Sequence, residues 1–446
     1  MREMKDSGIQ WIGAIPNDWN VIRIKDACWL KGRIGWDGLK SSEYLDEGPF
    51  LITGTDFHNG YINWNSCVHI SQERFNQDSD IHIQEDDLLI TKDGTVGKVA
   101  VVKNCPEKVS LNSGVLLVRN TKSIKYHQKY LYYVLLSPQF WIWYELSQTG
   151  NSTIKHLYQE QFYNFALSFP SLSEQKCISD YLDIKCSDID RIISKSKASI
   201  EGYKELKHSI ISSSVTKGVR PERPMKECGI DWIQSIPKSW ECHKVLHGLI
   251  MPITDGPHTT PELFDEGIPF VSAEAVSCGK GGIDFNHIRG YISADFYEEC
   301  CKKYIPKKED ILMIKSGATT GRVSIVDTDK IFTIWSPLAV FRVNPQVLHS
   351  KYTFYALQSD YFQKQIEFGW TYGTQQNIGM RTLEQLKILY PPLDEQVEIA
   401  SYLDYQCSKI DSLIAAKEKF ITELDSYKKS LIYEYVTGKK EVPSNA

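Results

Sequence analysis

Apolar residues recur at alternating spacings of three and four along two long stretches of the chain, 171–217 and 392–438. In the first stretch they are Ile178, Leu182, Ile189, Ile192, Tyr203, Leu206 and Ile210, and in the second Ile399, Leu403, Ile410, Leu413, Phe420, Leu424, Tyr427 and Leu431. This is the heptad pattern of a coiled coil. A helix of roughly 40 residues is some 60 Å long and must pair with another helix to bury such a seam. We therefore predict that the two helices pair with each other.

Both stretches begin as helices should. Pro170 precedes the first, and Pro391 and Pro392 stand at the beginning of the second, where the chain is still extended. Ser173 and Asp394 then stand where an N-cap is expected, ahead of an acidic first turn. Charged residues occur throughout both stretches, which excludes a membrane span.

The two stretches are copies of one another. Glu174 corresponds to Glu395 and Leu182 to Leu403, an offset of 221 residues. The segment Trp11 to Trp19 likewise recurs as Trp232 to Trp240, so the whole chain reads as a tandem duplication. The expected parts are a first globular domain at 1–170, a helix at 171–217, a second globular domain at 218–391 and a second helix at 392–438.

The sequence of the globular parts predicts mostly β-structure. Short β-branched or apolar runs between Gly, Asn and Pro predict strands at 88–91, 99–102, 115–119, 311–314, 323–326 and 339–343, with helices at 129–136 and 351–358. Each part is therefore expected to be a mixed α+β domain with a strongly twisted sheet. Because the tryptophans at 11, 19, 232 and 240 recur at identical spacing, we predict that they pack within the fold rather than stack on a ligand.

The duplication is uneven. The helices, their starts and the Trp-Ile segments agree residue by residue, whereas 25–65 differs from 244–286 and 148–157 differs from 370–380. A shared scaffold that carries two divergent surfaces indicates two different binding specificities.

The ordered set of these features resembles the specificity subunit of a type I restriction–modification system. The features that carry the resemblance are Trp11 to Trp19 and its repeat, the loop Lys315 to Val323, the turn Gly373 to Ile378 and the two Pro-x-Leu-x-Glu-Gln helix starts. The resemblance implies two tandem target-recognition domains of mixed α/β structure, separated by two long antiparallel coiled-coil helices. Each domain would read one half of a bipartite double-stranded DNA site. The first copy departs from the pattern, because Thr149 to Ile154 replaces the Gly-Thr-Gln turn.

Two loops bracketed by glycine, 92–98 and 315–322, combine a cation, hydroxyl groups and flexible backbone N–H groups. Such a combination suits contact with phosphates or base edges. The candidate DNA-binding residues are Lys92, Thr95, Lys98, Asn151, Lys155, Lys315, Thr319, Thr320, Arg322, Thr374, Gln375, Gln376 and Asn377. The alternatives are that the loops are plain hairpin connections with solvated cations, and that the amides cap their own backbone.

Composition narrows the classes of function. The formal net charge is −5, so strong DNA binding by the chain alone is not expected, and any DNA contact needs local basic patches or a partner. The eleven cysteines show no metal-ligand spacing, and we expect them to be reduced and mostly buried. No signal peptide is recognisable, which predicts a cytoplasmic protein.

The sequence shows neither the cofactor loop of a methyltransferase nor a nucleotide-binding loop. We therefore expect no catalytic residue, cofactor or metal site, and a recognition subunit rather than an enzyme. The resemblance implies modification (methyltransferase) subunits and restriction (endonuclease and translocase) subunits as partners. The alternative is a coiled-coil protein-interaction scaffold without a DNA role, which the net negative charge would suit.

Overall fold

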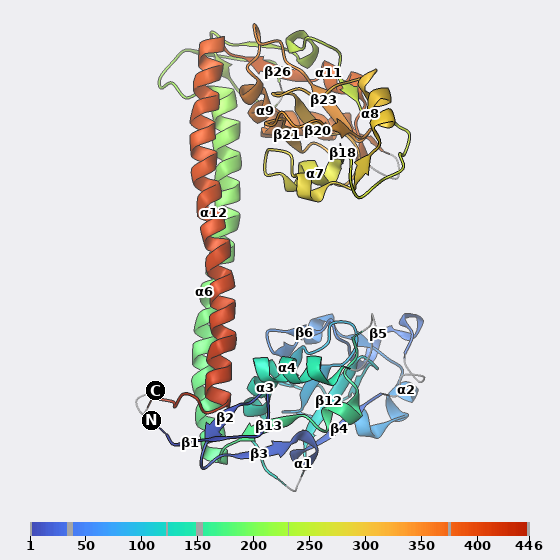
Figure 1. Cartoon of the computed structure of the whole chain (residues 1–446), viewed down its shortest axis with the longest axis vertical. Helices are drawn as coiled ribbons and strands as arrows, with labels where there is room; N and C mark the ends of the chain where they lie inside the picture. The colour runs from blue at the N-terminus through green and yellow to red at the C-terminus, as the bar shows by residue number, and fades with distance from the viewer. Residues whose placement is uncertain are drawn as a thin grey trace. The chain divides into compact units, whose positions relative to one another are not determined.

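The structure, a computed structural model, describes residues 2–33, 39–121, 124–148, 155–230, 232–372 and 376–443. It forms two compact units, Met1–Ser196 with Glu418–Ala446 (unit 1) and Lys197–Lys417 (unit 2). The long helices α6 (Leu172–Lys217) and α12 (Leu393–Val436) each contribute one part to each unit (Figure 1).

Unit 1 is built on a six-stranded sheet. Its strands in spatial order are β4 (Cys28–Gly32), β12 (Val115–Asn120), β9 (Leu88–Thr91), β10 (Val99–Val101), β7 (Tyr61–Ile62) and β6 (Phe57–His58). The smaller sheets are β11 (Val109–Leu111), β5 (Leu45–Ile52) and β8 (Val68–His69); β1 (Met4–Asp6) with β2 (Ala14–Pro16); and β13 (Ala166–Phe169) with β3 (Asn20–Arg23). The short helices are α1 (Ile24–Ala27), α2 (Gln72–Asn76), α3 (Gln128–Leu136), α4 (Pro138–Ser147) and α5 (Gln159–Phe162).

Unit 2 repeats the central part of this sheet. Its strands in spatial order are β17 (Thr254–Asp255), β23 (Leu338–Phe341), β20 (Ile311–Ile314) and β21 (Val323–Ile325). The smaller sheets are β19 (Tyr291–Ile292), β18 (Ile268–Val271) and β22 (Thr333–Ile334); β14 (Met225–Lys226) with β15 (Ile236–Pro237); β16 (Glu241–Lys244) with β26 (Lys387–Tyr390); and β24 (Thr371–Tyr372) with β25 (Gln376–Asn377). The short helices are α7 (Ala273–Cys278), α8 (Ala294–Cys301), α9 (Ser350–Gln358), α10 (Asp360–Gly369) and α11 (Met380–Gln385).

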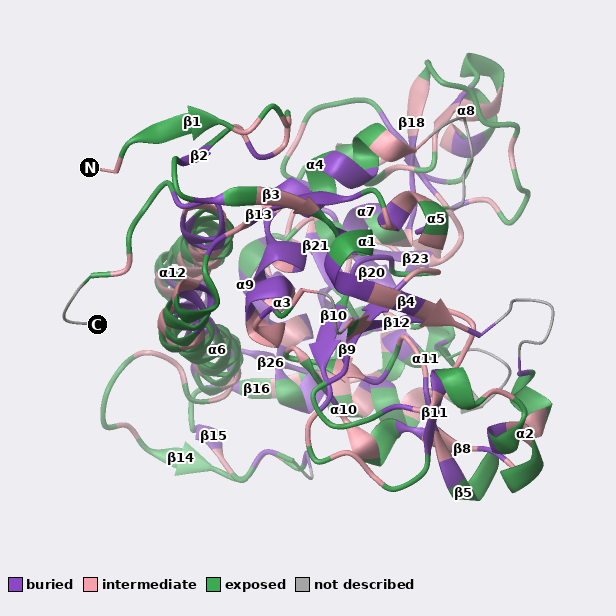
Figure 2. Cartoon of the chain, turned by 90° about the horizontal axis from the view of Figure 1, so that it is seen from below, coloured by how far each residue is buried: buried purple, intermediate pink, exposed green. Residues whose placement is uncertain are grey.

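The six-stranded sheet of unit 1 and the four-stranded sheet of unit 2 are each buried on both faces. Leu88 and Ile90 of β9 join one apolar core of unit 1, whereas Leu89 between them joins another. This follows from the alternation of side chains along a strand, and it explains why β9 reads as a continuous apolar run. Figure 2 shows the resulting buried strands in purple. The predicted strands and helices are present, with ends displaced by one or two residues: the strand expected at 339–343, for example, is β23.

In each unit, α6 and α12 share a core. In unit 1 the first part of α6 packs with the last part of α12, through Ile178, Leu182, Cys186, Ile189 and Ile193 with Leu431, Ile432, Tyr435 and Val436. In unit 2 the last part of α6 packs with the first part of α12, through Ile211 and Val215 with Ile399, Ala400, Leu403 and Cys407. The pairing is therefore antiparallel. Equivalent ion pairs of 2.7 Å, Lys428 with Asp190 and Lys207 with Asp411, accompany the two packed regions.

The predicted seam is only partly correct. Five residues assigned to it are exposed instead, namely Ile192, Leu206, Leu413, Phe420 and Tyr427. The buried positions in α6 include Ile193, Ser196 and Ile200, so the seam passes through a serine that the apolar pattern does not include. The exposed residues consequently lie on the outer surface of the helix pair.

The predicted N-caps are also wrong. Helix α6 begins at Leu172 and α12 at Leu393, so Ser173 and Asp394 both lie inside the first turn. At α6 the capping hydroxyl belongs to Ser171, whose Oγ accepts a 3.3 Å hydrogen bond from the backbone N–H of Glu174.

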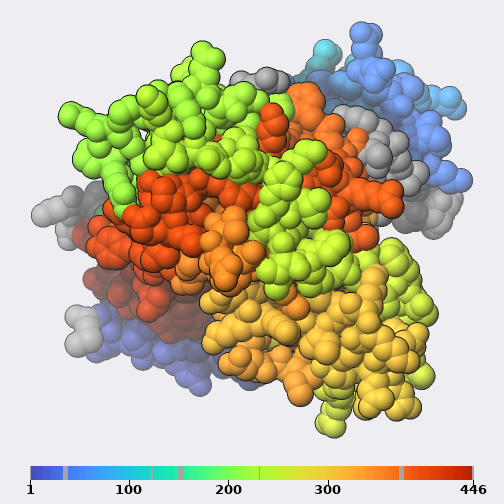
Figure 3. Space-filling view, turned by 90° about the horizontal axis from the view of Figure 1, so that it is seen from above, coloured from blue at the N-terminus to red at the C-terminus, as the bar shows by residue number. Residues whose placement is uncertain are grey.

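Two of the four repeated tryptophans are fully buried and anchor the helix starts. The indole N–H of Trp19 donates to Glu174 (3.0 Å), and that of Trp240 donates to Glu395 (2.9 Å). Arg223 pairs with the same buried carboxylate of Glu395. In Figure 3 the segment that follows α6 lies beside the start of α12, where this pairing occurs.

The other two tryptophans differ from each other. Trp11 is partly buried, and its indole N–H donates to the carbonyl of Ala166 (2.9 Å). Trp232 is 37% exposed and stacks on Phe368, so the packing prediction is wrong for this position. All eleven cysteines are free in the structure, and only five are buried, fewer than predicted.

Candidate nucleic-acid interface

The first predicted loop, 92–98, joins the antiparallel strands β9 and β10 of unit 1. The hydroxyl of Thr91 holds the loop, because it donates to the carbonyl of Thr95 (2.5 Å) and accepts from the backbone N–H of Lys98 (2.9 Å). Gly97 has a φ of +84°, and a Cβ there would lie 2.5 Å from Trp141, so only glycine fits. The loop is thus a tightly built hairpin connection.

The segment after residue 154 lies beside this loop. The backbone N–H of Leu157 donates to the carbonyl of Lys92 (2.9 Å), and the imidazole of His156 contacts the carboxylate of Asp93. Lys98 and Lys155 are exposed, and Lys98 also donates to the carbonyl of Gly54 (3.2 Å). Two of the predicted cations are therefore available to solvent on this surface, which we call reading surface 1 (92–98 with 155–157).

Unit 2 builds the equivalent surface from 315–322 and 376–378, here called reading surface 2. The backbone N–H of Ile378 donates to the carbonyl of Lys315 (2.9 Å), as that of Leu157 does to Lys92. A further backbone bond joins Gly317 to the carbonyl of Gln376 (3.0 Å). The loop and the amide-bearing segment, far apart in sequence, are thereby brought together.

The side chains of reading surface 2 divide into two groups. Arg322, Gln376 and Asn377 are exposed. Thr319 and Thr320 are engaged within the protein, since Thr320 donates to the carbonyl of Gly317 (2.7 Å) and Thr319 accepts from Ser277 (3.3 Å). These two hydroxyls shape the loop. The predicted residues Asn151, Thr374 and Gln375 lie outside the described residues.

One charged residue beside reading surface 2 was not predicted. Asp255, on β17, is 1% exposed and lies beside three basic side chains, two lysines and a histidine. Lys303 donates to its Oδ1, while the ammonium of Lys315 lies 3.3 Å and the imidazole of His258 3.2 Å from its Oδ2. Neither of the last two groups is aligned to donate a hydrogen bond to Oδ2, so Lys315 acts on it through its charge.

The charge state of Asp255 follows from these neighbours. Burial raises the pKa of Asp255, but the hydrogen bond from Lys303 and the charges of Lys303 and Lys315 lower it, and the net pKa lies below its usual range. The carboxylate is therefore ionised at neutral pH and fixes Lys315 beside the loop. The sequence showed only a Thr-Asp-Gly-Pro turn at 254–257, which carries no sign of contact with residues 48 and 60 positions away.

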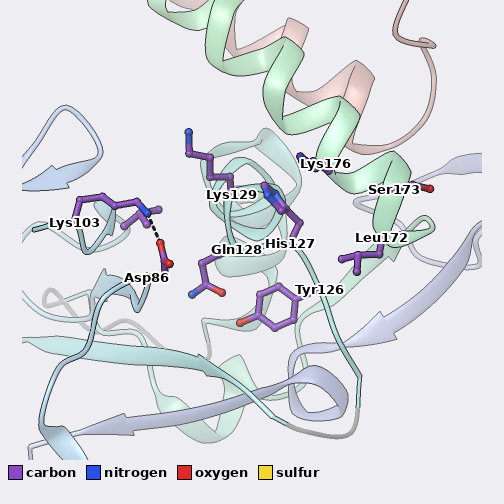
Figure 4. A pocket seen from close by; sticks show the side chains of 10 residues that line it. Asp86, Lys103, Tyr126, His127, Gln128, Lys129, Leu172, Ser173 and Lys176 are labelled. Atoms are coloured by element: carbon purple, nitrogen blue, oxygen red, sulfur yellow. Dashed lines mark hydrogen bonds and ion pairs between the residues drawn. The ribbon is translucent and has the colours of Figure 1, made fainter. Parts of the chain in front are cut away.

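A hollow in unit 1 lies elsewhere. It has a volume of about 760 Å³ and is lined by Asp86, Val101, Lys103, Tyr126, His127, Gln128, Lys129, Leu172, Ser173 and Lys176 (Figure 4). Lys103 pairs with Asp86, and Lys129 pairs with Asp183. Because most of its positive charge is compensated, this hollow does not present the surface that a phosphate backbone requires.

Within the described part of the chain, no group of three His, Cys, Asp or Glu side chains is arranged to hold a metal ion. Over those same residues, no helix combines the length and the apolar character needed to cross a membrane.

Comparisons with known proteins agree with this arrangement. The family described as "Type I restriction modification DNA specificity domain" matches residues 16–202 and 257–423. The specificity subunit of the type I restriction enzyme MjaVIII from Methanocaldococcus jannaschii is 25% identical over 437 residues, covering 96% of this chain and 94% of that protein. The EcoBI specificity subunit from Escherichia coli is 22% identical over 365 residues, covering 80% and 74%.

Solved structures share the fold. A chain from work on complex assembly and conformational transition of the type I R-M system has a TM-score of 0.70 at 16% identity, covering 96% of this chain and 99% of that one. The HsdS subunit from Thermoanaerobacter tengcongensis has a TM-score of 0.51 at 16% identity, covering 96% and 98%. The predicted fold class is confirmed. Because the two family matches span well over half of its residues, the chain belongs to the type I restriction–modification DNA specificity family.

Proposed function

We propose that this chain directs a type I restriction–modification complex to a bipartite DNA site. Residues 1–170 read one half-site and residues 218–391 read the other. The helices at 171–217 and 392–438 set the gap between the half-sites and dock the methyltransferase subunits. Restriction subunits join this complex for cleavage, and the complex works on DNA in the cytoplasm.

The observation that carries the proposal is the repetition of one loop-and-segment construction with different side chains. The same backbone hydrogen bond, 2.9 Å in both units, joins Leu157 to Lys92 and Ile378 to Lys315. A conserved frame that presents different polar groups supports two half-sites of different sequence.

The side chains at the centre of each surface illustrate the difference. Reading surface 1 carries Asp93 in contact with His156, at the positions where reading surface 2 carries Ser316 and Asn377, whose backbones form an antiparallel β-bridge. An imidazole and an amide offer different donor and acceptor patterns to a base edge in the major groove. The two surfaces are therefore suited to different bases.

The exposed cations supply positioning contacts. Lys98 and Lys155 in unit 1 and Arg322 in unit 2 suit phosphate oxygens, and Gln376 suits an adenine edge. With a net charge of −5, these few contacts bind DNA weakly without help. We infer that the partner subunits contribute much of the affinity.

The outer surface of the helix pair supports two docked copies of one partner. In unit 1 it exposes Ile184, Ile192 and Tyr427; in unit 2 it exposes Tyr405, Leu413 and Leu206 at positions offset by 221 residues. Apolar side chains that recur in this way on both units favour an interaction surface over chance exposure. Two methyltransferase subunits, one on each copy, fit this repetition.

The test is to sequence the methylated genome of a host that expresses this chain with its methyltransferase. A bipartite methylated motif is expected. Replacing residues 20–168 with the matching domain of another specificity subunit should change one half of the motif and leave the other half and the gap unchanged.

Lengthening each helix by two turns, about 11 Å, should change the gap and keep both half-sites. A domain exchange that altered both halves, or longer helices that altered the bases, would refute this division of labour. The purified chain alone should show no methyl transfer.

The alternative of a protein-interaction scaffold without a DNA role is contradicted by the family match, which is to a DNA specificity domain. The exposed helix surface remains a protein-docking feature, and it belongs to the same complex.

A further inference from the structure

The two reading surfaces begin with a lysine in the same backbone position. The N–H groups of Lys92 and Lys315 each donate a 2.8 Å hydrogen bond, to the carbonyls of Gly114 and Pro337. Their own carbonyls each accept a 2.9 Å bond from the adjoining segment. Differences between the two lysines therefore arise from their side-chain surroundings rather than from the backbone.

In unit 2 the lysine is compensated by a buried carboxylate. The Lys315 side chain is only 12% exposed, and its ammonium lies 3.3 Å from Oδ2 of Asp255. Asp255 in turn sits on β17, where its cross-strand partner is Ala339 of β23. Lys303 donates to the other oxygen of Asp255, so the carboxylate is anchored from two sides.

In unit 1 the corresponding strand position is a glycine. Gly32 of β4 pairs with Leu116 of β12, as Asp255 pairs with Ala339. A Cβ on Gly32 would lie 3.5 Å from Nζ of Lys92, so a side chain at this position would face the lysine directly. Among the described residues, no carboxylate lies within ion-pair distance of Lys92.

We propose that Asp255 is a positioning residue that holds Lys315 in a buried ion pair, so that only reading surface 1 uses its loop lysine as a phosphate contact. The inference rests on the proposed function, because it assigns charges within the proposed DNA-reading surfaces. The second half-site is then held by Arg322 and by base contacts, while the first gains a sequence-independent contact from Lys92.

The proposal makes opposite predictions for two substitutions. Asp255→Asn removes the compensating charge and adds one net positive charge to reading surface 2. Gly32→Asp places a carboxylate beside Lys92 and lowers the net charge of reading surface 1 by one. Each phosphate contact contributes about 0.9 to the slope of log K against log salt. Asp255→Asn should steepen that slope by about one, and Gly32→Asp should flatten it by about one.

The measurement uses the full chain in complex with its methyltransferase subunits and a duplex that carries the methylated motif, titrated between roughly 50 and 200 mM salt. Over this range, gaining or losing one phosphate contact changes the factor by which salt weakens binding about three- to fourfold. The double variant Asp255→Asn with Lys315→Gln should return the slope to that of the unmodified complex.

Matched controls separate charge from structure. Asp310→Asn removes a buried carboxylate that pairs with Arg342 at the opposite end of β20, so it should lower stability and leave the slope unchanged. A Cβ on Gly32 would lie 3.2 Å from the carbonyl of Val115, so Gly32→Ala reports the effect of bulk alone. Thermal unfolding of every variant identifies any that is misfolded.

The outcomes are distinguishable. Unchanged slopes in folded Asp255→Asn and Gly32→Asp complexes, or equal changes in the Asp310→Asn and Gly32→Ala controls, would overturn the role of Asp255. Absence of motif-dependent binding by the unmodified complex would instead refute the proposed function.

Discussion

Replacing Leu403 with alanine tests the pairing of α6 and α12 within unit 2. Leu403 has no exposed surface and belongs to the core that also contains Val215, Trp240 and Cys407. The substitution removes buried apolar surface and leaves a cavity that neighbouring helices can fill only partly.

The expected magnitude is large for one residue. Leu→Ala at fully buried positions costs about 2–5 kcal/mol. In a unit of this size, each kcal/mol lowers the melting temperature by about 2–4 °C. The transition of unit 2 should therefore fall by at least 4 °C, measured by differential scanning calorimetry on the full chain.

Two further variants act as controls. Leu413→Ala lies ten residues along the same helix, but its side chain is 40% exposed, so it should cost no more than about 0.5 kcal/mol. Leu182→Ala is the equivalent buried change in unit 1 and should shift the other transition. If Leu413 lies at a docking surface, Leu413→Ala should weaken methyltransferase binding instead, as measured by calorimetric titration.

The reasoning fails if Leu413→Ala lowers the melting temperature as much as Leu403→Ala. That result would mean that the seam follows the simple apolar heptad and that the buried residues described here are not those that hold the helices together.

Three further predictions follow from the charged contacts. Arg223→Ala should cost about 3–5 kcal/mol by denaturant unfolding, because it leaves a buried carboxylate without its cation, whereas Arg2→Ala at the more exposed equivalent pair should cost about 1 kcal/mol. The pKa of Asp255 in the folded state lies below its ordinary value of 3.8, so its carboxylate stabilises the fold above pH 3.8 and this stabilisation is lost as the pH falls through the folded pKa. The free energy of unfolding, measured from pH 5 to pH 2, should therefore decrease less for Asp255→Asn than for the unmodified chain. Arg322→Ala should weaken binding to all duplexes alike, whereas Gln376→Ala should relax one position of the methylated motif at a cost of about 1–3 kcal/mol; a sequence-selective loss from Arg322→Ala would contradict these roles.

The duplication explains how much of the fold could be predicted. Repeated residues such as Leu182 and Leu403 were correctly placed in buried seams, because spacing in sequence sets the face of a helix. Ile192 and Leu413 were misplaced by the same rule, because the helix pair buries Ser196 in its seam and leaves these two apolar side chains exposed. The prediction of a recognition subunit is confirmed by family membership.

The candidate site was harder to predict because its parts meet only in three dimensions. The glycines at 94 and 97 marked one loop, and the Lys-Ser-Gly run marked the other. The role of Asp255 depends on a cross-strand position and on Lys303, neither of which leaves a local pattern in the sequence. The significance of Gly32 could be seen only by comparing the same strand position in the two units.

The composition of unit 1 has a consequence for how the protein is made. Its core requires Leu431, Ile432, Tyr435 and Val436, although most of the unit is encoded before residue 197. Unit 2 is a single continuous segment, so during synthesis it can finish folding while unit 1 still lacks one wall of its core. The apolar surface of unit 1 that is synthesised first stays exposed until the last part of α12 has been synthesised and covers it. A premature stop codon after residue 417 would therefore leave unit 2 able to fold but leave unit 1 incomplete and open to proteolysis.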